Sequence, residues 1–342
     1  MEDNREFENN ELENNNPDKK FNKRVIVHII LIALILAFFA YIGVRLYRWN
    51  KGKVDDTDVS VINHDFDVEV MDYILPMDPK LLEGREDDGV TKIVFLGNNP
   101  LDKARWDDSS ICRLVQKELT DSGENAEVYN CSVGESLVAS INETYANNVP
   151  IDAFGFYWVS AAIATSDYSN MDDAYSHLGY ENTGMVETID TLKSIDFETI
   201  DVIAIMYDGN DFRCDRPLDD GDAVNIQYYT GAMEAGLQTI QAAYPHIRIM
   251  VLSPTYEYGV DENGKYIDAD LKKNYFGSLS TYVQKESDTC YENSVSYIDN
   301  YYGTVNEINA KEYLEDNQQL NEEGRKMVAK RFVECLNKYK NK

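Results

Sequence analysis

Asparagine, aspartate and glycine residues that could contact a ligand gather at four places in the sequence of 342 residues. These are Gly97-Asn98-Asn99, Asn130-Cys131-Ser132-Val133-Gly134, Asp208-Gly209-Asn210-Asp211 and Asp316-Asn317-Gln318-Gln319-Leu320-Asn321. Carboxamide side chains and backbone amides can donate hydrogen bonds to a ligand oxygen, and carboxylates can accept them. A carboxamide nitrogen is neither a nucleophile nor a base near neutral pH, because its lone pair is delocalised into the carbonyl group. The four segments therefore favour binding over proton transfer.

The elements that would position these segments follow from hydrophobic patterning. Short apolar runs bounded by turn residues predict buried strands at 92–96, 126–130, 201–207, 247–252 and 295–298. Helical spacing predicts helices at 108–119, with Asp108 or Ser109 as N-cap, and at about 224–243, 268–286 and 321–339. Apolar strands that alternate with helices predict a parallel sheet covered on both faces. Such sheets bind ligands at the carboxyl ends of their strands, where the first three segments lie.

Two stretches interrupt this alternation. Residues 151–184 are rich in aromatic residues and alanine, and we expect either a lid over the strand ends or an extra helix packed on the sheet. Residues 257–267 contain Asp261-Glu262-Asn263-Gly264 between short apolar flanks, which predicts a hairpin. A calcium loop is not expected there, because Tyr266 stands where such a loop needs glycine.

In their order and placement, the four segments resemble the motifs of the SGNH, or GDSL-type, hydrolase family. In that family a Gly-Asp-Ser turn follows the first strand and a glycine follows the second. A Gly-x-Asn-Asp motif follows the third strand, and Asp-x-x-His precedes the last helix. The resemblance covers residues 90–340, although the glycine of the third segment is displaced by one position. It implies a flavodoxin-like α/β fold of three layers with a parallel sheet.

The resemblance also implies roles for single residues. Asn99 occupies the position of the nucleophilic serine, Gln319 that of the histidine base, and Asp316 that of the acid that orients the base. The oxyanion donors would be the Asn99 amide, the Gly134 amide and the Asn210 side chain. The donors are kept while both halves of the proton-transfer pair are replaced by amides. We therefore expect a catalytically degenerate pocket that binds without cleaving.

An active esterase or O-acyl-transfer enzyme on envelope polysaccharide is the alternative, if nucleophile and base come from elsewhere. The candidate nucleophiles near the strand ends are Cys131, Ser132 and Ser253. The candidate bases are His64, His177 and His246. No Gly-x-Ser-x-Gly, HExxH or phosphate-binding glycine motif occurs in the sequence.

No cofactor and no metal are expected. Asp208, Asp211 and Asp316 could hold a cation, but we expect Asp208 and Asp211 to accept hydrogen bonds from backbone amides around their turn. The five cysteines lack zinc-site spacing and form no CxxC pair. We expect them to be small buried side chains, with a free thiol or an intermolecular disulfide as the alternative. They are Cys112, Cys131, Cys214, Cys290 and Cys335.

An apolar run at residues 25–44 contains His28 as its only ionisable side chain. A helix of this length spans about 30 Å of hydrocarbon, and the run is too long for the core of a cleaved signal peptide. It predicts one N-terminal transmembrane signal anchor, with a buried core helix as the less favoured interpretation. We then expect residues 1–24 to be a disordered cytoplasmic tail, 45–90 a stalk, and 91–342 an extracytoplasmic SGNH-hydrolase-like domain.

Charge limits the partners. Lys and Arg number 32 against 61 Asp and Glu, so the net charge is −29. This disfavours binding to nucleic acid and a polybasic contact with anionic lipid. A hydrophobic fraction of 43% excludes global disorder. By analogy with SGNH-like relatives that have one anchor, we expect a cell-membrane protein that binds a cell-envelope glycan or a membrane O-acyltransferase. A structural envelope protein with a vestigial pocket is a third possibility.

Overall fold

The computed structural model describes residues 31–42, 69–178, 183–219, 221 and 224–339. The chain divides into two compact units after Asp67, and each is considered by itself. In the first unit, residues 31–42 are helical. No helix in the described part of the chain is long and apolar enough to cross a membrane. The predicted span at 25–44 extends beyond the described residues at both ends, so the anchor stays a prediction.

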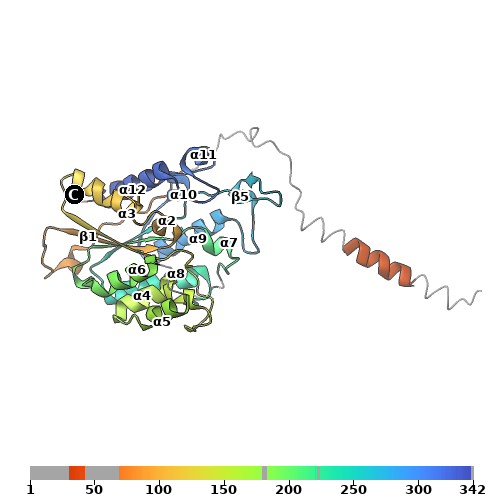
Figure 1. The fold of residues 1–342 in the computed structure, drawn as a ribbon, viewed down its shortest axis with the longest axis horizontal. Helices are drawn as coiled ribbons and strands as arrows, with labels where there is room; N and C mark the ends of the chain where they lie inside the picture. Colours follow the sequence, from red (N-terminus) through yellow and green to blue (C-terminus); the bar gives the residue numbers. More distant parts are fainter. Residues whose placement is uncertain (1–30, 43–68, 179–182, 220, 222–223, 340–342) are drawn as a thin grey trace, which may run out of the picture. The chain divides into compact units, whose positions relative to one another are not determined.

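A five-stranded parallel sheet forms the centre of the second unit (Figure 1). Its strands, in spatial order, are β2 (Ala126–Ser132), β1 (Thr91–Gly97), β3 (Val202–Met206), β4 (Arg248–Leu252) and β7 (Ser296–Ile298). All neighbouring pairs are parallel. This is the 2-1-3-4-5 order of flavodoxin-like folds. The five predicted strands and the predicted parallel sheet are confirmed.

The central strands are apolar because both faces of the sheet are covered. Every residue of β3 and the last five residues of β1 are buried. Strand β2 lies at an edge and exposes Glu127. A parallel strand buried on both faces appears in a sequence as a continuous apolar run. This is why the inner strands could be located from the sequence alone.

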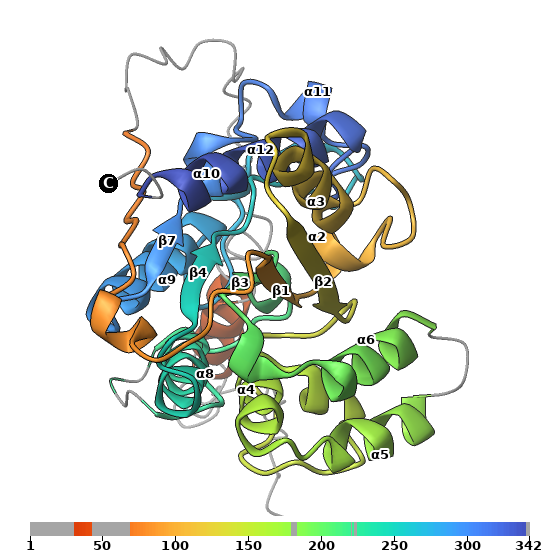
Figure 2. The ribbon, with the colours of Figure 1, turned by 90° about the vertical axis from the view of Figure 1, so that its left-hand side faces the viewer.

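Helices cover the two faces of the sheet (Figure 2). On one face, α3 (Ile111–Asp121) packs against α12 (Glu322–Asn337), and Phe332 of α12 meets Phe95 of β1 with 5.0 Å between ring centroids. The opposite face carries α4 (Phe156–Thr165), α6 (Thr183–Ser194) and α8 (Tyr229–Ala243), with α9 (Leu279–Glu292) beside α8 and β7. Gly236 permits the close contact of α8 with α4, because a Cβ there would lie 2.5 Å from the Phe156 ring.

The remaining elements are short, apart from α5. They are η2 (Pro79–Leu82), α2 (Asn99–Asp102), η3 (Pro150–Phe154), α5 (Ser169–Leu178), η4 (Phe197–Thr199), α7 (Asn210–Arg213), β5 (Gly259–Val260), β6 (Tyr266–Ile267), η5 (Ala269–Leu271), α10 (Asn300–Gly303) and α11 (Ala310–Tyr313). Strands β5 and β6 form the predicted hairpin, whose turn residue Gly264 has a φ of +77°. The described part of residues 151–184 contains η3, α4 and α5, which pack on one another, on α6 and on α8. Extra helices are therefore present, as the second of the two expectations for this stretch has it, and their main contacts are with other helices.

Three helices begin later than predicted. Ser110 caps α3 through its side chain, so the predicted caps Asp108 and Ser109 are wrong. Helix α8 begins at Tyr229 instead of residue 224. Helix α9 begins after a capping box at Ser278, because the residues before it belong to the hairpin and the loop that follows. In each case a local hydrogen bond or turn sets the boundary, and hydrophobic spacing does not detect it.

Residues 69–90 belong to the second unit and not to a stalk. Tyr73 exchanges backbone hydrogen bonds with Tyr297 at the edge strand β7. Asp72 forms an ion pair of 2.7 Å with Arg331. The compact unit begins at Val68, before the predicted boundary at residue 91. This segment is held by backbone pairing and ion pairs. Because such contacts need no regular spacing of apolar residues, the sequence shows no periodic pattern there.

Candidate functional site

Three loops meet at the carboxyl ends of β1, β2 and β3. Gly97 has a φ of +156°, and a Cβ there would lie 1.9 Å from the carbonyl oxygen of Met206 at the end of β3. Any larger residue would force the two strand ends apart. The close approach joins the first and third motif segments, and the backbone amide of Val133 in the second donates to the Gly97 carbonyl oxygen at 2.9 Å. The first three segments therefore meet, as the sequence predicts.

Asn98 is fully buried and connects all three loops. Its Nδ2 donates to the carbonyl oxygen of Ser136 and to Oδ1 of Asp208, both at 2.9 Å. Its Oδ1 accepts from the backbone amide of Asp208 at 2.9 Å. All of these bonds go to protein atoms, so Asn98 fixes the loops.

Asn99, in the position of the nucleophile, is held on both sides of its carboxamide. Oδ1 accepts from the backbone amide of Glu135 at 2.9 Å, and Nδ2 donates to Oδ2 of Asp208 at 3.1 Å. The residue is 8% exposed. The side chain thus forms a second bridge between the loops after β1, β2 and β3.

The other two predicted oxyanion donors lie beside Asn99. A Cβ on Gly134 would lie 3.4 Å from the Asn99 Oδ1 atom. The Asn210 Nδ2 donates to the carbonyl oxygen of Glu135 at 3.1 Å. The structure therefore assembles the three predicted donor residues. The side chains of Asn99 and Asn210, however, form their hydrogen bonds with protein atoms.

Beside these amides lies an ion-pair cluster of Asp208, Arg213 and Glu257. Arg213 donates to Oδ2 of Asp208 at 2.7 Å and to Oε2 of Glu257. Its side chain is 18% exposed, and those of the two acids are 11% and 7% exposed. Burial disfavours the cation, but the two carboxylates outweigh it and raise the pKa of Arg213. Burial raises the pKa of Glu257 to about 7 although Arg213 opposes that shift.

Asp211 fixes the loop after β2. Its carboxyl oxygens accept from the backbone amides of Val138 and Ala139 at 2.8 and 2.9 Å. Burial raises its pKa to about 6, against the effect of these two hydrogen bonds. Asp208 accepts from the amide of Asn210 within its own turn, as predicted.

Among the described residues, no group of three or more His, Cys, Asp or Glu side chains could hold a metal ion.

The fourth segment does not join the other three through a hydrogen bond to Asn99. The exposed Asp316 accepts through Oδ1 from the backbone amides of Gln318 and Gln319, at 2.8 and 2.7 Å. The segment approaches the first loop through the ion pair of Lys103 with Glu315. The carboxylate predicted to orient a base therefore stabilises its own turn.

The strand order and the three assembled motif segments match what the resemblance implies. The chain has an SGNH hydrolase-like fold. No protein-family model matches the sequence, and no curated protein matches it.

Solved structures with detectable similarity include three bacterial examples. The first is a protein from Lactobacillus plantarum, with 14% identity and a TM-score of 0.48, covering 73% of this chain and 97% of that one. A possible lipase from Chitinophaga pinensis has 13% identity and a TM-score of 0.47, with coverage of 73% and 99%. A lipase/acylhydrolase from Enterococcus faecalis has 14% identity and a TM-score of 0.39, with coverage of 71% and 93%. None of the three reaches a TM-score of 0.5, so the fold assignment rests on this chain's own topology and motif placement.

The alternative nucleophiles of the SGNH-like domain are buried and engaged. Burial raises the pKa of the Cys131 thiol to about 12. The hydroxyl of Ser132, fully buried, donates to Oδ1 of Asn130 at 2.7 Å. The Ser253 hydroxyl, also fully buried, accepts from the amide of Asn300 at 2.9 Å. None of these groups is placed to attack a substrate.

The two described histidines lie away from the assembled amides. His177 is exposed on α5, and its Nδ1 lies 2.8 Å from the carbonyl oxygen of Asp173. His246 precedes β4, so it lies at the amino end of the sheet, and its Nε2 is 3.3 Å from the carbonyl oxygen of Phe197. His64 lies outside the described residues.

Sequence reasoning missed Arg213 and Glu257. Arg213 follows Asn210 by three positions, which is one helical turn, so the side chain returns to the same side of α7. The three-residue spacing in the sequence indicates that Arg213 lies on the same side as Asn210. Glu257 enters the site from the segment after β4, and no local pattern marks it.

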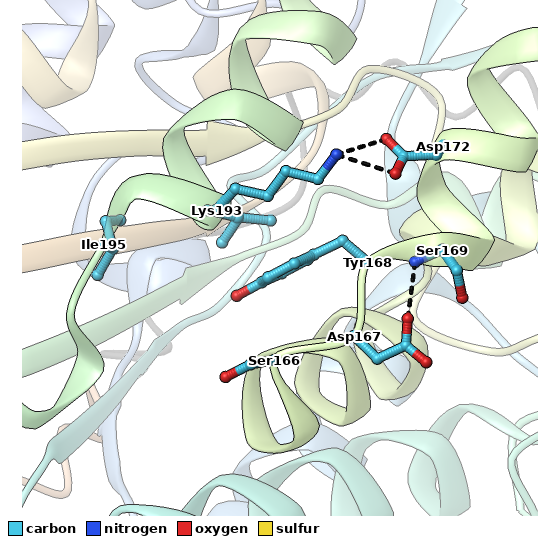
Figure 3. A pocket seen from close by; sticks show the side chains of 8 residues that line it. Ser166, Asp167, Tyr168, Ser169, Asp172, Lys193 and Ile195 are labelled. Carbon is cyan, nitrogen blue, oxygen red and sulfur yellow. Dashed lines mark hydrogen bonds and ion pairs between the residues drawn. The ribbon is translucent and has the colours of Figure 1, made fainter.

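A separate pocket of about 390 Å³ lies next to α5 and the end of α6 (Figure 3). Its lining includes Lys193, which pairs with the two carboxylate oxygens of Asp172 at 2.7 and 2.9 Å. Ile195, also in the lining, leads towards the amino end of β3. The pocket is therefore at the opposite end of the sheet from the assembled amides. Its lysine is paired with Asp172, and the second carboxylate of the lining, Asp167, accepts from the backbone amide of Ser169.

Proposed function

We propose that this chain is an SGNH-like binding protein that has lost serine-hydrolase chemistry. The observation that carries the proposal is the Asn99 carboxamide, held between the Glu135 amide and the Asp208 carboxylate. A carboxamide has no nucleophilic oxygen or nitrogen that a base could activate. Gln319, in the position of the base, has no basic nitrogen either. Both halves of the proton transfer that acyl cleavage needs are absent from these positions.

An active esterase with a noncanonical nucleophile is the second candidate, and Cys214 is the residue that favours it. This cysteine is exposed, and its Sγ lies 3.6 Å from Oδ1 of Asn210. Burial and the nearby Asp211 raise the pKa of its thiol, which lowers the fraction of reactive thiolate. Among the described residues, no histidine lies beside Cys214 to act as its base. These features favour binding over catalysis.

The setting is part of the same proposal. The apolar run at 25–44 would anchor the protein in the cell membrane, with the SGNH-like domain outside. There it would bind a cell-envelope glycan or a membrane O-acyltransferase. The length of the run supports the anchor, and the layout of SGNH-like relatives with one anchor supports the partner. A net charge of −29 would repel phosphate-rich envelope polymers.

Hydrolysis of p-nitrophenyl acetate by the full chain in detergent tests the loss of chemistry. We expect the wild type to match the buffer rate. Turnover well above buffer that disappears in Cys214→Ala would overturn the proposal in favour of the esterase. Turnover that appears only in Asn99→Ser/Gln319→His would support it, because the rest of the site would then be intact.

Protease accessibility tests the proposed location. Protease added to intact cells should degrade the SGNH-like domain and leave a short anchored fragment. Full protection in intact cells, with degradation after lysis, would contradict the extracytoplasmic placement.

A further inference from the structure

A row of tyrosine rings leads outward from Glu257. Tyr256 and Tyr258 flank this residue, and their rings meet edge to face with centroids 5.4 Å apart. Tyr258 stacks on Tyr266 of the hairpin at 5.5 Å, with only 18° between the ring planes. At the inner end, Tyr256 packs on the buried Tyr301 at 6.0 Å. The same short segment thus carries an acid of the ion-pair cluster and two rings of the row.

The outer end of the row is exposed and firmly held. Tyr266 is 47% exposed. The backbone amide of Tyr258 donates to the carbonyl oxygen of Asn317 at 2.7 Å, and Nδ2 of Asn317 donates back to the Tyr258 carbonyl oxygen at 3.2 Å. The hairpin projects from the domain near α11 (Figure 1). A ring supported from behind by a second ring loses little freedom when a ligand covers it.

We propose that Tyr266, backed by Tyr258, is a stacking platform for a neutral polysaccharide whose pyranose rings are joined by equatorial linkages. Such sugars present a flat face of C–H bonds, which an aromatic ring covers well. This inference rests on the proposed function, since it names the class of ligand that a non-cleaving SGNH-like protein would hold. It places that ligand on the hairpin that follows Glu257 of the ion-pair cluster.

The surroundings of Tyr266 favour a glycan over a protein or an anionic polymer. The turn residues that precede the ring, Glu262, Asn263 and Lys265, are exposed and polar, whereas the core of a protein interface is depleted of charged residues. A net charge of −29 disfavours polyanions. Exposed polar side chains beside the ring can exchange hydrogen bonds with sugar hydroxyl groups.

Isothermal titration of the full chain in detergent with cellohexaose and with chitohexaose tests the proposal. We expect saturable binding of at least one of these neutral hexamers. Tyr266→Ala should weaken it by roughly tenfold, the contribution of about one aromatic contact. Tyr266→Phe should bind within about twofold of the wild type, because the ring and not the hydroxyl makes the contact. Tyr291→Ala is the matched control: this tyrosine is 66% exposed on α9, outside the row.

Three results of the titrations would overturn the inference. They are absence of binding to both hexamers at millimolar concentration, binding that Tyr266→Ala leaves unchanged, and tighter binding of an acidic hexamer of galacturonic acid. A protein partner captured through Tyr266 that neither hexamer displaces would also overturn it. Ester hydrolysis is measured separately, so a failed platform and a failed non-catalytic assignment give different results.

Discussion

The Asn99 Nδ2 atom donates to the Asp208 carboxylate across 3.1 Å, which joins the loop after β1 to the loop after β3. Its Oδ1 simultaneously accepts from Glu135 in the loop after β2. A carboxamide carries its donor and its acceptor on separate atoms, so it can bridge two loops at once. A serine hydroxyl would have to reach both from a single oxygen. The residue in the nucleophile position therefore acts as a crosslink.

Replacing Asn99 by alanine should destabilise the domain by about 1–3 kcal/mol, because the Asp208 carboxylate and the Glu135 amide each lose a partner in a part-buried site. The free energy of unfolding from urea titration of the full chain measures this. Asn148→Ala, at an exposed position, is the control and should change it by less than about 0.5 kcal/mol. Equal losses in the two variants would contradict the crosslink.

Arg213→Met should cost more, about 3–5 kcal/mol, because it leaves two buried carboxylates without their cation. Arg113→Met is the control, since that side chain is 57% exposed and pairs only distantly with Asp108. Adding Glu257→Gln to Arg213→Met should restore part of the loss, because one of the unpaired charges is then removed. The same urea titration measures all three variants. A double variant no more stable than Arg213→Met would contradict this account.

The sheet could be predicted because its signal is local. Buried parallel strands are continuous apolar runs, and the turn residues after β1 and β3 end those runs sharply. The close approach at Gly97 then requires the first three motif segments to meet. Fold and neighbouring loops were therefore accessible from the sequence.

The contacts that decide the chemistry were less accessible. No sequence pattern near Glu257 predicts its ion pair with Arg213, because only the packing of two loops brings the two residues together. Asp316 was placed correctly before the last helix, but its carboxylate is taken by the amides of Gln318 and Gln319. A motif gives the position of a residue along the chain. The hydrogen bonds that occupy its side chain depend on the folded surroundings.

Cys214 should be the thiol that reacts first in the native protein. It is exposed, whereas the other four cysteines are buried, and all five are free. Iodoacetamide at pH 8 should modify one thiol per chain, identified by peptide mass mapping, and Cys214→Ser should abolish the fast reaction. The raised pKa of this thiol predicts a rate that increases further as the pH rises above 8. Fast labelling of a second cysteine, or a disulfide in the native protein, would contradict the assignment.

Glu286 on α9 should make the domain less stable as the pH rises. Its side chain is 1% exposed, and no cation pairs with it among the described residues; the hydroxyl of Tyr229 on α8 is the polar group that faces it. Burial raises the pKa of Glu286 well above its usual value, although the Tyr229 hydroxyl opposes the shift, and the negative charges of Asp211 and Asp299 add to it. Below about pH 4.5 the carboxyl group is protonated in both the folded and the unfolded chain, so it does not affect the balance. Above that pH the unfolded chain ionises while the folded domain keeps the proton, and the free energy of unfolding falls.

Glu286→Gln removes this dependence, because the amide is uncharged at every pH and has nearly the same shape. The variant should therefore unfold at a higher temperature than the wild type at pH 8, by roughly 2–4 °C for each kcal/mol gained. The difference should shrink towards pH 4, where the wild-type carboxyl group is neutral in both states. Glu292→Gln, at an exposed position near the end of the same helix, should show neither effect. Melting curves of the full chains from pH 4 to 8 provide the comparison. If Glu286→Gln instead becomes less stable than the wild type as the pH rises, the buried carboxylate is ionised and paired, and the prediction is wrong.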